Sequence, residues 1–449
     1  MLMLNRPPKL VLELLSRIYN IRIISCVFLV AFSFTISAAR ASSADQAISL
    51  STAMQRSLSQ NPSLKFFPYR IDALKGQMEA AKLSPAYELG FDTDNIGGTG
   101  NYNGISGAEF TIALSSVFEM DNKRLARIGT VSSELSLLEA SRQVESLALL
   151  GDVTRRYVDV LAAQEQVVLA QEATQLSIDT LDIVKKRAAA GATPDAEVKR
   201  ALAALEQARL SLFAEQQRLS YLKVSLSSLW GSSSPDFENV EGNLFQFGED
   251  ISFEQLFERV KLNPAIEIFA SEARLKDAEI RVAKTQSKSD ISWSVGVRRT
   301  QDTNDTALVA GFSMPLFSGS RNQGAISTAI AEKNQVFVKR DVMLLDMHNQ
   351  LFRAFYNRKQ AILVVNSLRS TIIPSLEQAL IETQDAYQRG RYGYLDYVSS
   401  RQELLSARRT LIEAAASALT YGAEIEQLTS EPLASSQYNE NIKLSGISQ

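Results

Sequence analysis

Two very long stretches that lack helix-breaking residues constrain this sequence more than any other feature. From about Lys123 to Arg187 the chain has no proline and only two glycines. A second stretch, from about Asn322 to Gln388, has one proline, Pro374, which should kink the helix or mark a transition there. At about 1.5 Å per residue, each stretch predicts a helix on the order of 95–100 Å long. Helices of that length need long neighbours to pack against.

Each stretch is followed by a short break and a second helical segment that supplies such a neighbour. The breaks lie at 188–196 and 389–394, and both contain glycine. Apolar residues then recur every seven positions in both segments: Leu205, Leu212, Leu219 and Leu226, and Leu404, Leu411, Ala418 and Ile425. A seven-residue spacing is typical of coiled-coil packing. The breaks are therefore expected to be the turns of two antiparallel helical hairpins.

The two halves of the chain follow the same order of signals. The segment ISLSTAMQRSLSQNPSL, 48–64, and the segment ISFEQLFERVKLNPAI, 251–266, both begin with Ile-Ser and close on Asn-Pro. Each is followed by helical residues, two strand signals, a long helix, a break and a return helix. This order predicts two structural repeats of about 200 residues. We place them at 42–242 and 243–430, followed by a polar tail at 431–449.

Four short segments alternate apolar and polar residues with a period of two, which predicts strands with one apolar face. The apolar positions are Tyr87, Leu89 and Phe91; Phe110, Ile112 and Leu114; Ile291, Trp293, Val295 and Val297; and Leu308, Ala310, Phe312 and Met314. A strand that faces a soluble core gives the same pattern. The intervening residues are mostly small or polar, which favours strands with one face toward lipid and the other toward a water-filled lumen.

The composition excludes several classes of function. A net charge of −3 and a pI of about 5.6, without a long basic run, argue against nucleic-acid binding. One cysteine and one histidine cannot build a thiolate or imidazole metal centre. Met343, Met347 and His348 lie close on one expected helix, but such methionine pairs more often pack than bind Cu(I). No set of nucleophile, base and partner is visible, so we expect neither an enzyme nor a cofactor.

The first 41 residues have the features of a secretory signal peptide. Basic residues precede an apolar run from Ile23 to Ile36, which is too short to span a bilayer comfortably. Ala39-Arg40-Ala41 then fits a cleavage site, with an N-terminal anchor as the alternative. The apolar run follows Cys26 rather than preceding it, which disfavours lipidation of that cysteine. Cleavage after Ala41 would leave a mature chain without cysteine.

Four strands cannot close a barrel, and an open strand edge cannot lie in lipid. Either the strands form a soluble sheet, or several copies of the chain pool them into one closed barrel. Pooling would leave the helical hairpins extending from the same end of the barrel as a tube. The expected fold is therefore mainly α-helical with a membrane β-barrel, and a soluble periplasmic coiled-coil scaffold or adaptor is the alternative from a different class.

Several stretches resemble the TolC family of outer-membrane efflux conduits, and most closely its cobalt–zinc–cadmium branch. The resemblance covers 46–430 and includes ISLSTAM, NPSL, DNIGGTG, AEFTIALSSVFEMDNKR, MPLFSGSR, RGRYGYLDYVSSRQELLSARR and EIEQLTS. It implies a homotrimer with a 12-stranded barrel in the outer membrane of a Gram-negative bacterium and an α-helical tunnel in the periplasm. It also implies a periplasmic adaptor and an inner-membrane resistance–nodulation–division pump. The chain would be a passive exit duct for heavy-metal cations, or alternatively for drugs or secreted polypeptides.

The resemblance also implies roles for residues near the two breaks. Glu197 and Asp396, each six residues after a glycine of its break, match acids that line the periplasmic entrance. An acid in the first turn of a helix is also favoured without any such role. Tyr387 matches a residue that links neighbouring hairpins, with core packing as the alternative. The family has a second acid one turn beyond Asp396, where this chain has Ser399.

Two further sets of residues are assigned by the resemblance. Residues at the hairpin tips match adaptor-docking loops: Gly191, Ala192, Thr193, Gly390, Arg391, Tyr392 and Gly393. The strand-to-helix turns contain Asp121, Asn122 and Gly319. The metal branch usually has Gly-Gly where this chain has Asp121-Asn122. Aspartate and asparagine tolerate the left-handed conformation, so the turn is expected to form.

Overall fold

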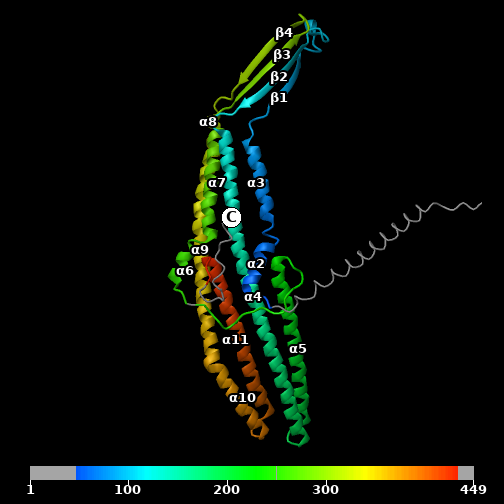
Figure 1. The fold of residues 1–449 in the computed structure, drawn as a ribbon, viewed down its shortest axis with the longest axis vertical. Helices are drawn as coiled ribbons and strands as arrows, with labels where there is room; N and C mark the ends of the chain where they lie inside the picture. The colour runs from blue at the N-terminus through cyan, green and yellow to red at the C-terminus, as the bar shows by residue number, and fades with distance from the viewer. Residues whose placement is uncertain (1–46, 249, 433–449) are drawn as a thin grey trace, which may run out of the picture.

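The computed structural model describes residues 47–248 and 250–432 (Figure 1). The expected signal peptide at 1–41 and nearly all of the expected tail lie outside this range. The molecule is elongated, with a four-stranded sheet at one end and a long bundle of helices below it. None of the described helices is long and apolar enough to cross a membrane.

Two helical columns run the length of the bundle. One is α4, Lys123–Ala189, a single helix of 67 residues. The other consists of α9, Gln323–Ser367, a π-helical turn, Leu368–Ile372, and α10, Ile373–Gln388. Pro374 lies in the first turn of α10, directly after the π-helical turn. Proline lacks an N–H and clashes with the carbonyl one turn before it, and the wider π-helical turn accommodates both effects. The predicted transition at Pro374 is confirmed.

The other two columns are each built from separate helices (Figure 1). One has α2 and α3 above α5, and the other has α6 and α7 above α11. Their bounds are Leu50–Gln60 for α2, Phe66–Lys82 for α3, Asp195–Ser227 for α5, Phe253–Val260 for α6, Pro264–Gln286 for α7 and Tyr394–Thr429 for α11. Both columns change helix near the middle of the bundle: α5 ends in a short 3₁₀ turn, Ser228–Trp230, and α11 ends at Thr429.

The Asn-Pro motif of each repeat joins the two parts of these columns. The buried Asn61 side chain donates to the carbonyl of Leu229 at 2.7 Å, just beyond the end of α5. The buried Asn263 side chain donates to the carbonyl of Leu428 at 2.9 Å, at the end of α11. Each asparagine also accepts a hydrogen bond, at 2.8 Å, from the backbone N–H two residues later. In both repeats the asparagine therefore satisfies a carbonyl at the end of the lower helix. Asn263 also caps the start of α7, whereas Asn61 ends α2 and a turn separates it from α3.

We predict that Asn263→Ala destabilises the fold by about 2–4 kcal/mol, because it removes a helix cap and leaves a buried carbonyl unsatisfied. The measurement is the shift in the thermal unfolding midpoint of the detergent-purified protein. Asn334→Ala is the matched control, since Asn334 lies exposed inside α9 and alanine is the better helix former there. Equal shifts of the unfolding midpoint for the two substitutions would contradict the role of Asn263 in joining α11 to α7.

The sheet is antiparallel throughout, in the order β1-β2-β3-β4. The strands are Glu88–Asp94, Glu109–Phe118, Ile291–Thr300 and Asp305–Ser313. The register aligns apolar residues in rows across all four strands, such as Leu89, Leu114, Val295 and Ala310, or Phe91, Ile112, Val297 and Leu308. Leu308 is 84% exposed, so this apolar face is uncovered in the single chain.

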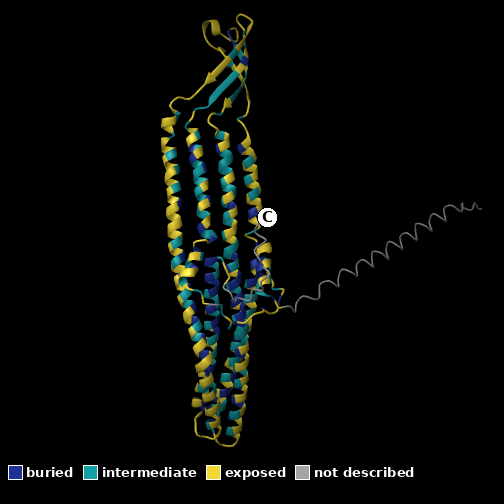
Figure 2. Cartoon of the chain, turned by 60° about the vertical axis from the view of Figure 1, so that its left-hand side comes forward, coloured by how far each residue is buried: buried dark blue, intermediate teal, exposed yellow. Residues whose placement is uncertain are grey.

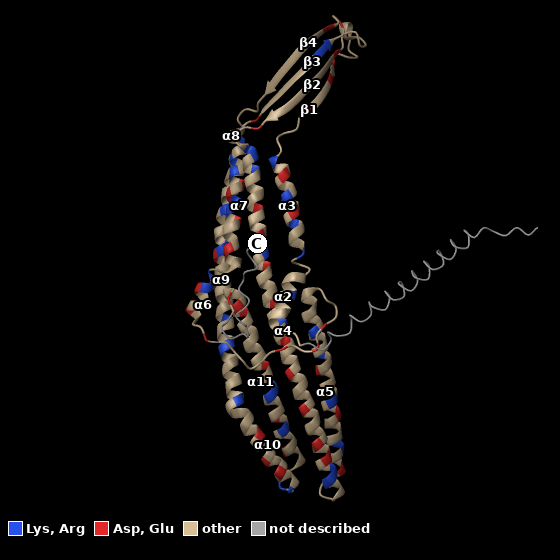
Figure 3. Cartoon of the chain, in the orientation of Figure 1, with Lys and Arg blue, Asp and Glu red and all other residues tan. Residues whose placement is uncertain are grey.

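The opposite face of the sheet has small and charged side chains. Its rows include Gly90, Ala113, Gly296 and Val309, and, nearer the loop end, Asp92, Thr111, Arg298 and Ala307. Arg298 pairs with Glu109 at 2.9 Å on this face. Figure 3 shows that charged residues are otherwise spread over the helical bundle. The predicted alternation of apolar and polar faces is confirmed in all four strands.

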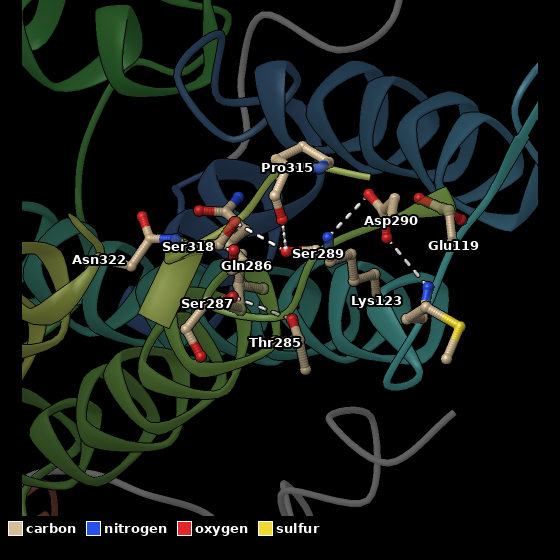
Figure 4. A network of polar contacts seen from close by, with 12 residues as sticks. Glu119, Lys123, Thr285, Gln286, Ser287, Ser289, Asp290, Pro315, Ser318 and Asn322 are labelled. Atoms are coloured by element: carbon tan, nitrogen blue, oxygen red, sulfur yellow. Dashed lines mark hydrogen bonds and ion pairs between the residues drawn. The ribbon is translucent and has the colours of Figure 1, made fainter. Parts of the chain in front are cut away.

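A polar network holds the sheet on the helices (Figure 4). Asp290, just before β3, pairs with Lys123 at 2.7 Å and accepts from the backbone N–H of Met120 at 3.0 Å. The neighbouring Ser289 hydroxyl lies 2.8 Å from the Ser318 hydroxyl. Residues at the start of β3 therefore contact both the turn that leads into α4 and the turn that leads into α8, Ser318–Arg321.

The apolar core lies mainly in the lower half of the bundle, where buried residues gather in Figure 2. Near the middle, Tyr157 is buried and donates to the carbonyl of Ile48 at 2.8 Å. Toward the tips, a second cluster joins both hairpins and contains Leu181, Val184, Leu205, Tyr387, Tyr397 and Leu404. The seam between α4 and α11 is therefore closed over much of its length.

Candidate functional site: the hairpin tips and the seam above them

The two hairpin turns have the same backbone geometry. Gly191 and Gly390 adopt φ values of +73° and +74°, in the left-handed region that glycine favours. The N–H of Ala192 reaches back to the carbonyl of Arg187 at 2.9 Å, and the N–H of Arg391 reaches the carbonyl of Ala386 at 2.8 Å. These hydrogen bonds satisfy carbonyls at the helix end and require a left-handed residue just after it, which explains the glycine at each break.

Tyr387 is one of the residues through which the second hairpin contacts the first. Its side chain is 1% exposed, and its ring stacks on Tyr397 with the centroids 5.6 Å apart. Its hydroxyl donates to Glu197 Oε2 at 3.1 Å, and the Thr193 hydroxyl donates to the same oxygen. Burial raises the pKa of Tyr387, and the Glu197 carboxylate adds to that increase. Tyr387 therefore packs in the core and also forms a polar link between the hairpins.

Arg187 makes a second link at the same height, and the sequence analysis did not find it. Its Nη1 donates to the carbonyls of Tyr387, at 2.5 Å, and Gln388, at 2.9 Å. The guanidinium also lies 4.6 Å from the centroid of the Tyr387 ring. A cation near the carbonyls at the end of α10 is favoured by the helix dipole. A basic residue in the last turn of α4 was the available signal, but it could not reveal a partner 200 residues away.

The two candidate gate acids have different surroundings. Glu197 is half-buried in the seam, where Tyr387 and Thr193 hold its carboxylate. Asp396 is exposed and accepts from the backbone N–H of Gly393 at 2.9 Å, so it caps α11. Ser399 is also exposed and donates to Glu403 at 3.2 Å. Glu197 and Asp396 therefore share no partner among the described residues of one chain.

The remaining tip residues lie on the surface. Gly191, Ala192, Gly390, Arg391, Tyr392 and Gly393 are exposed, and Thr193 is half-buried. The Tyr392 side chain is 53% exposed on a turn whose geometry does not need an aromatic residue. The tips thus present an arginine and a tyrosine to the surroundings, which are residue types common at the centres of protein interfaces.

The strand-to-helix turns use left-handed residues, although not all at the expected positions. Asp121 and Asn122 have φ values of +60° and +58°, as their residue types predict. At the second turn the left-handed residue is Phe317, with φ of +60°, whereas Gly319 lies within α8. An aromatic residue in this conformation is uncommon, so nothing in the sequence pointed to Phe317.

The methionines and the histidine on α9 lie among apolar and aromatic groups. Met347 is buried beside Leu351 and Leu256. The His348 ring meets Phe253 and Phe257 edge-on, at centroid distances of 5.4 and 4.8 Å. Within 47–248 and 250–432, no group of three or more His, Cys, Asp or Glu side chains could hold a metal ion. The interpretation of these residues as packing residues agrees with their surroundings.

The model of the family described as "Outer membrane efflux protein" matches residues 53–232 and 260–431. The chain is a member of this family. The two matched segments together cover more than half of the chain, and each contains one long hairpin. The chain is thus an outer-membrane efflux channel of a tripartite system in a Gram-negative bacterium, and it is not an enzyme. This excludes the soluble scaffold considered above.

This efflux protein is similar in sequence to three proteins whose names state different cargoes. It is 24% identical to the cobalt-zinc-cadmium resistance protein CzcC of Cupriavidus metallidurans, over 80% of this chain and 85% of CzcC. It is 22% identical to the nickel-cobalt-cadmium resistance protein NccC of Alcaligenes xylosoxydans xylosoxydans, over 66% and 67% of the two chains. It is 26% identical to the pyoverdine export outer membrane protein OpmQ of Pseudomonas putida, over 74% and 73%.

The fold of the chain is that of solved channels of the same kind. The crystal structure of CusC, described as forming a transmembrane channel, matches with a TM-score of 0.70 at 17% identity, over 85% of this chain and 91% of CusC. The expected TolC-like fold, mainly helical with four antiparallel strands from two halves, is confirmed.

Proposed function

We propose that this efflux channel is a homotrimer and a passive exit duct for heavy-metal cations. Three copies would close a 12-stranded barrel in outer-membrane lipid, and their repeats, 42–242 and 243–430, would form a helical tunnel in the periplasm. A periplasmic adaptor and an inner-membrane resistance–nodulation–division pump would deliver the cations. Similarity to CzcC over most of both chains is the observation that carries the metal assignment.

The exposed sheet supports assembly from several copies. Among the residues that the structure describes, β1 and β4 each pair with one strand, which leaves each with an unpaired edge. A free edge and an uncovered apolar face are both unfavourable unless other strands and lipid cover them. Joining β4 of one copy to β1 of the next would remove every edge and turn the apolar face outward. The small and charged face would then line the lumen.

The contacts at the tips support a closed entrance. Glu197, Tyr387 and Arg187 connect the two hairpins of one chain, so opening requires these bonds to break. Asp396 is exposed just above its tip, where three copies would place three carboxylates around the axis. Such a ring would attract cations. Glu197 fits a role in closing the entrance better than a role in a ring, because its carboxylate is already engaged.

The tips are also the proposed docking site for the adaptor. Gly191, Ala192 and Thr193 form one turn, and Gly390, Arg391, Tyr392 and Gly393 form the other. Arg391 and Tyr392 are exposed and have the largest side chains of the two turns.

A second cargo has a specific observation in its favour. OpmQ, whose name assigns it to pyoverdine export, is 26% identical over 74% of this chain. The same duct could therefore serve export of a siderophore. A tube that does not bind its cargo tightly needs no ligand residues, so its walls do not distinguish the two cargoes.

The test is the growth of a host strain in which the gene is deleted. We expect tolerance to cobalt, zinc or cadmium to fall and to return with the wild-type gene. Secretion of siderophore should be unchanged in the same cultures. Unchanged metal tolerance together with lost siderophore secretion would replace the metal cargo with the second one.

A further inference from the structure

Arg401 is an unusual residue in the seam between α4 and α11. Its side chain is 6% exposed, although arginine is rarely buried without a carboxylate partner. Its Nη1 donates to the Thr180 hydroxyl at 2.9 Å and lies 3.5 Å from the carbonyl of Leu176. Its Nε is buried and has no hydrogen-bond partner among the described residues.

The positive charges of two other arginines between the hairpins have more favourable partners. Arg408, seven residues further along α11, pairs with Glu172 at 2.5 Å and with Glu377 at 2.7 Å. Arg187 is only half-buried, donates to two carbonyls and lies against the Tyr387 ring, although its Nε, like that of Arg401, has no hydrogen-bond partner among the described residues. By contrast, no carboxylate among the described residues forms an ion pair with Arg401. The groups around it are neutral and include the buried Tyr394 and Tyr397.

We infer that Arg401 is a built-in destabiliser of the closed seam, which keeps the entrance able to open. A buried charge without a counterion is costly, and separation of α4 from α11 would return it to water. Arg401 on α11 contacts Thr180 on α4, and Tyr387 on α10 contacts Glu197 on α5, so both contacts join the same two hairpins. Burial also lowers the pKa of the Arg401 guanidinium, as expected where the charged form is disfavoured.

A neighbouring copy of the chain offers little compensation for this charge. Arg401 is already only 6% exposed in a single chain, so a second copy has little of its surface left to contact. The inference rests on the proposed closed entrance. It adds that the contacts that close the entrance and the charge of Arg401, which favours opening, lie between the same two hairpins. A two-state element of this kind can be shifted by a modest external contact, such as one made by an adaptor at the tips.

The test uses single-channel recordings of the full-length protein in planar bilayers, in a Tyr387→Phe background that loosens the seam. Adding Arg401→Met should lower the open fraction by about tenfold, because it removes the unpaired charge while filling its volume. Adding Thr180→Asp to the same background should also lower it, because the new carboxylate supplies the missing counterion to Arg401. Arg408→Met removes ion pairs that are one third to one half exposed, so it should instead raise the open fraction slightly.

The combination Thr180→Asp/Arg401→Met sharpens the test. Each change alone should close the channel, but together they leave a buried carboxylate unpaired and should open it. If Arg401→Met opens the channel as Arg408→Met does, Arg401 stabilises the contact between the hairpins and the inference is wrong. Failure of Thr180→Asp to close the channel would also overturn it, even if Arg401→Met does not fold. Wild-type protein that forms no channel at all would instead contradict the proposed function.

Discussion

Leu308→Arg is expected to abolish insertion of the channel into the outer membrane. Leu308 is 84% exposed in the middle of β4, within the apolar row that includes Phe91, Ile112 and Val297. An arginine on the lipid face near the bilayer centre costs about 2–4 kcal/mol, and a trimer would carry three. The protein should therefore be missing from the outer-membrane fraction and from trimers resistant to mild detergent.

Val309→Arg is the matched control for this substitution. Val309 is the next residue of the same strand and lies on the opposite face of the sheet, in the row with Gly90, Ala113 and Gly296. A cation there would point into water, so insertion should be retained. If both variants insert equally well, the assignment of the apolar face to lipid is wrong.

Arg187→Met is expected to produce a leaky channel. The substitution removes two hydrogen bonds from a charged donor and a cation–π contact with Tyr387. Together these contacts stabilise the closed seam by about 2–4 kcal/mol per chain. We expect the open fraction in bilayers to rise at least tenfold, and cells to admit a large hydrophilic dye that the wild type excludes.

Arg389→Met is the control for Arg187→Met. Arg389 is close to the same tip, but within the described part of the chain its ion pair is with Asp385, one turn before it on the surface. An exposed pair of this kind contributes about 0–1 kcal/mol, so its loss should leave the conductance near the wild-type value. A leak of the same size from Arg389→Met would show that charge near the tip, rather than the link to Tyr387, controls the entrance.

The sequence predicted the elements of the fold well because their signals are local. The expected long helix, Lys123 to Arg187, differs from α4 only at its last turn. Alternation in Ile291 to Val297 identified β3, and Gly191 and Gly390 marked turns that need a left-handed residue. The same local signals could not give the order of the sheet, in which β2 of the first repeat pairs with β3 of the second.

The candidate site was less predictable, because its contacts join residues about 200 positions apart. Tyr387 and Glu197 were found only through resemblance to a family, and the bond between their side chains depends on how the hairpins pack. Arg187 and Arg401 have no local pattern that separates them from solvated arginines. Phe317 adopts a left-handed conformation that its residue type disfavours, so its conformation could not be predicted from the residue type.

The central claim is that this protein forms a duct that is closed at its periplasmic end by contacts between its own hairpins. Planar-bilayer conductance of the detergent-purified wild type, recorded beside Arg187→Met, tests it most directly. The account predicts small, cation-preferring steps in the wild type, large steps in Arg187→Met, and loss of the preference in Glu197→Ala/Asp396→Ala. Large, non-selective steps in the wild type that none of these substitutions changes would contradict it.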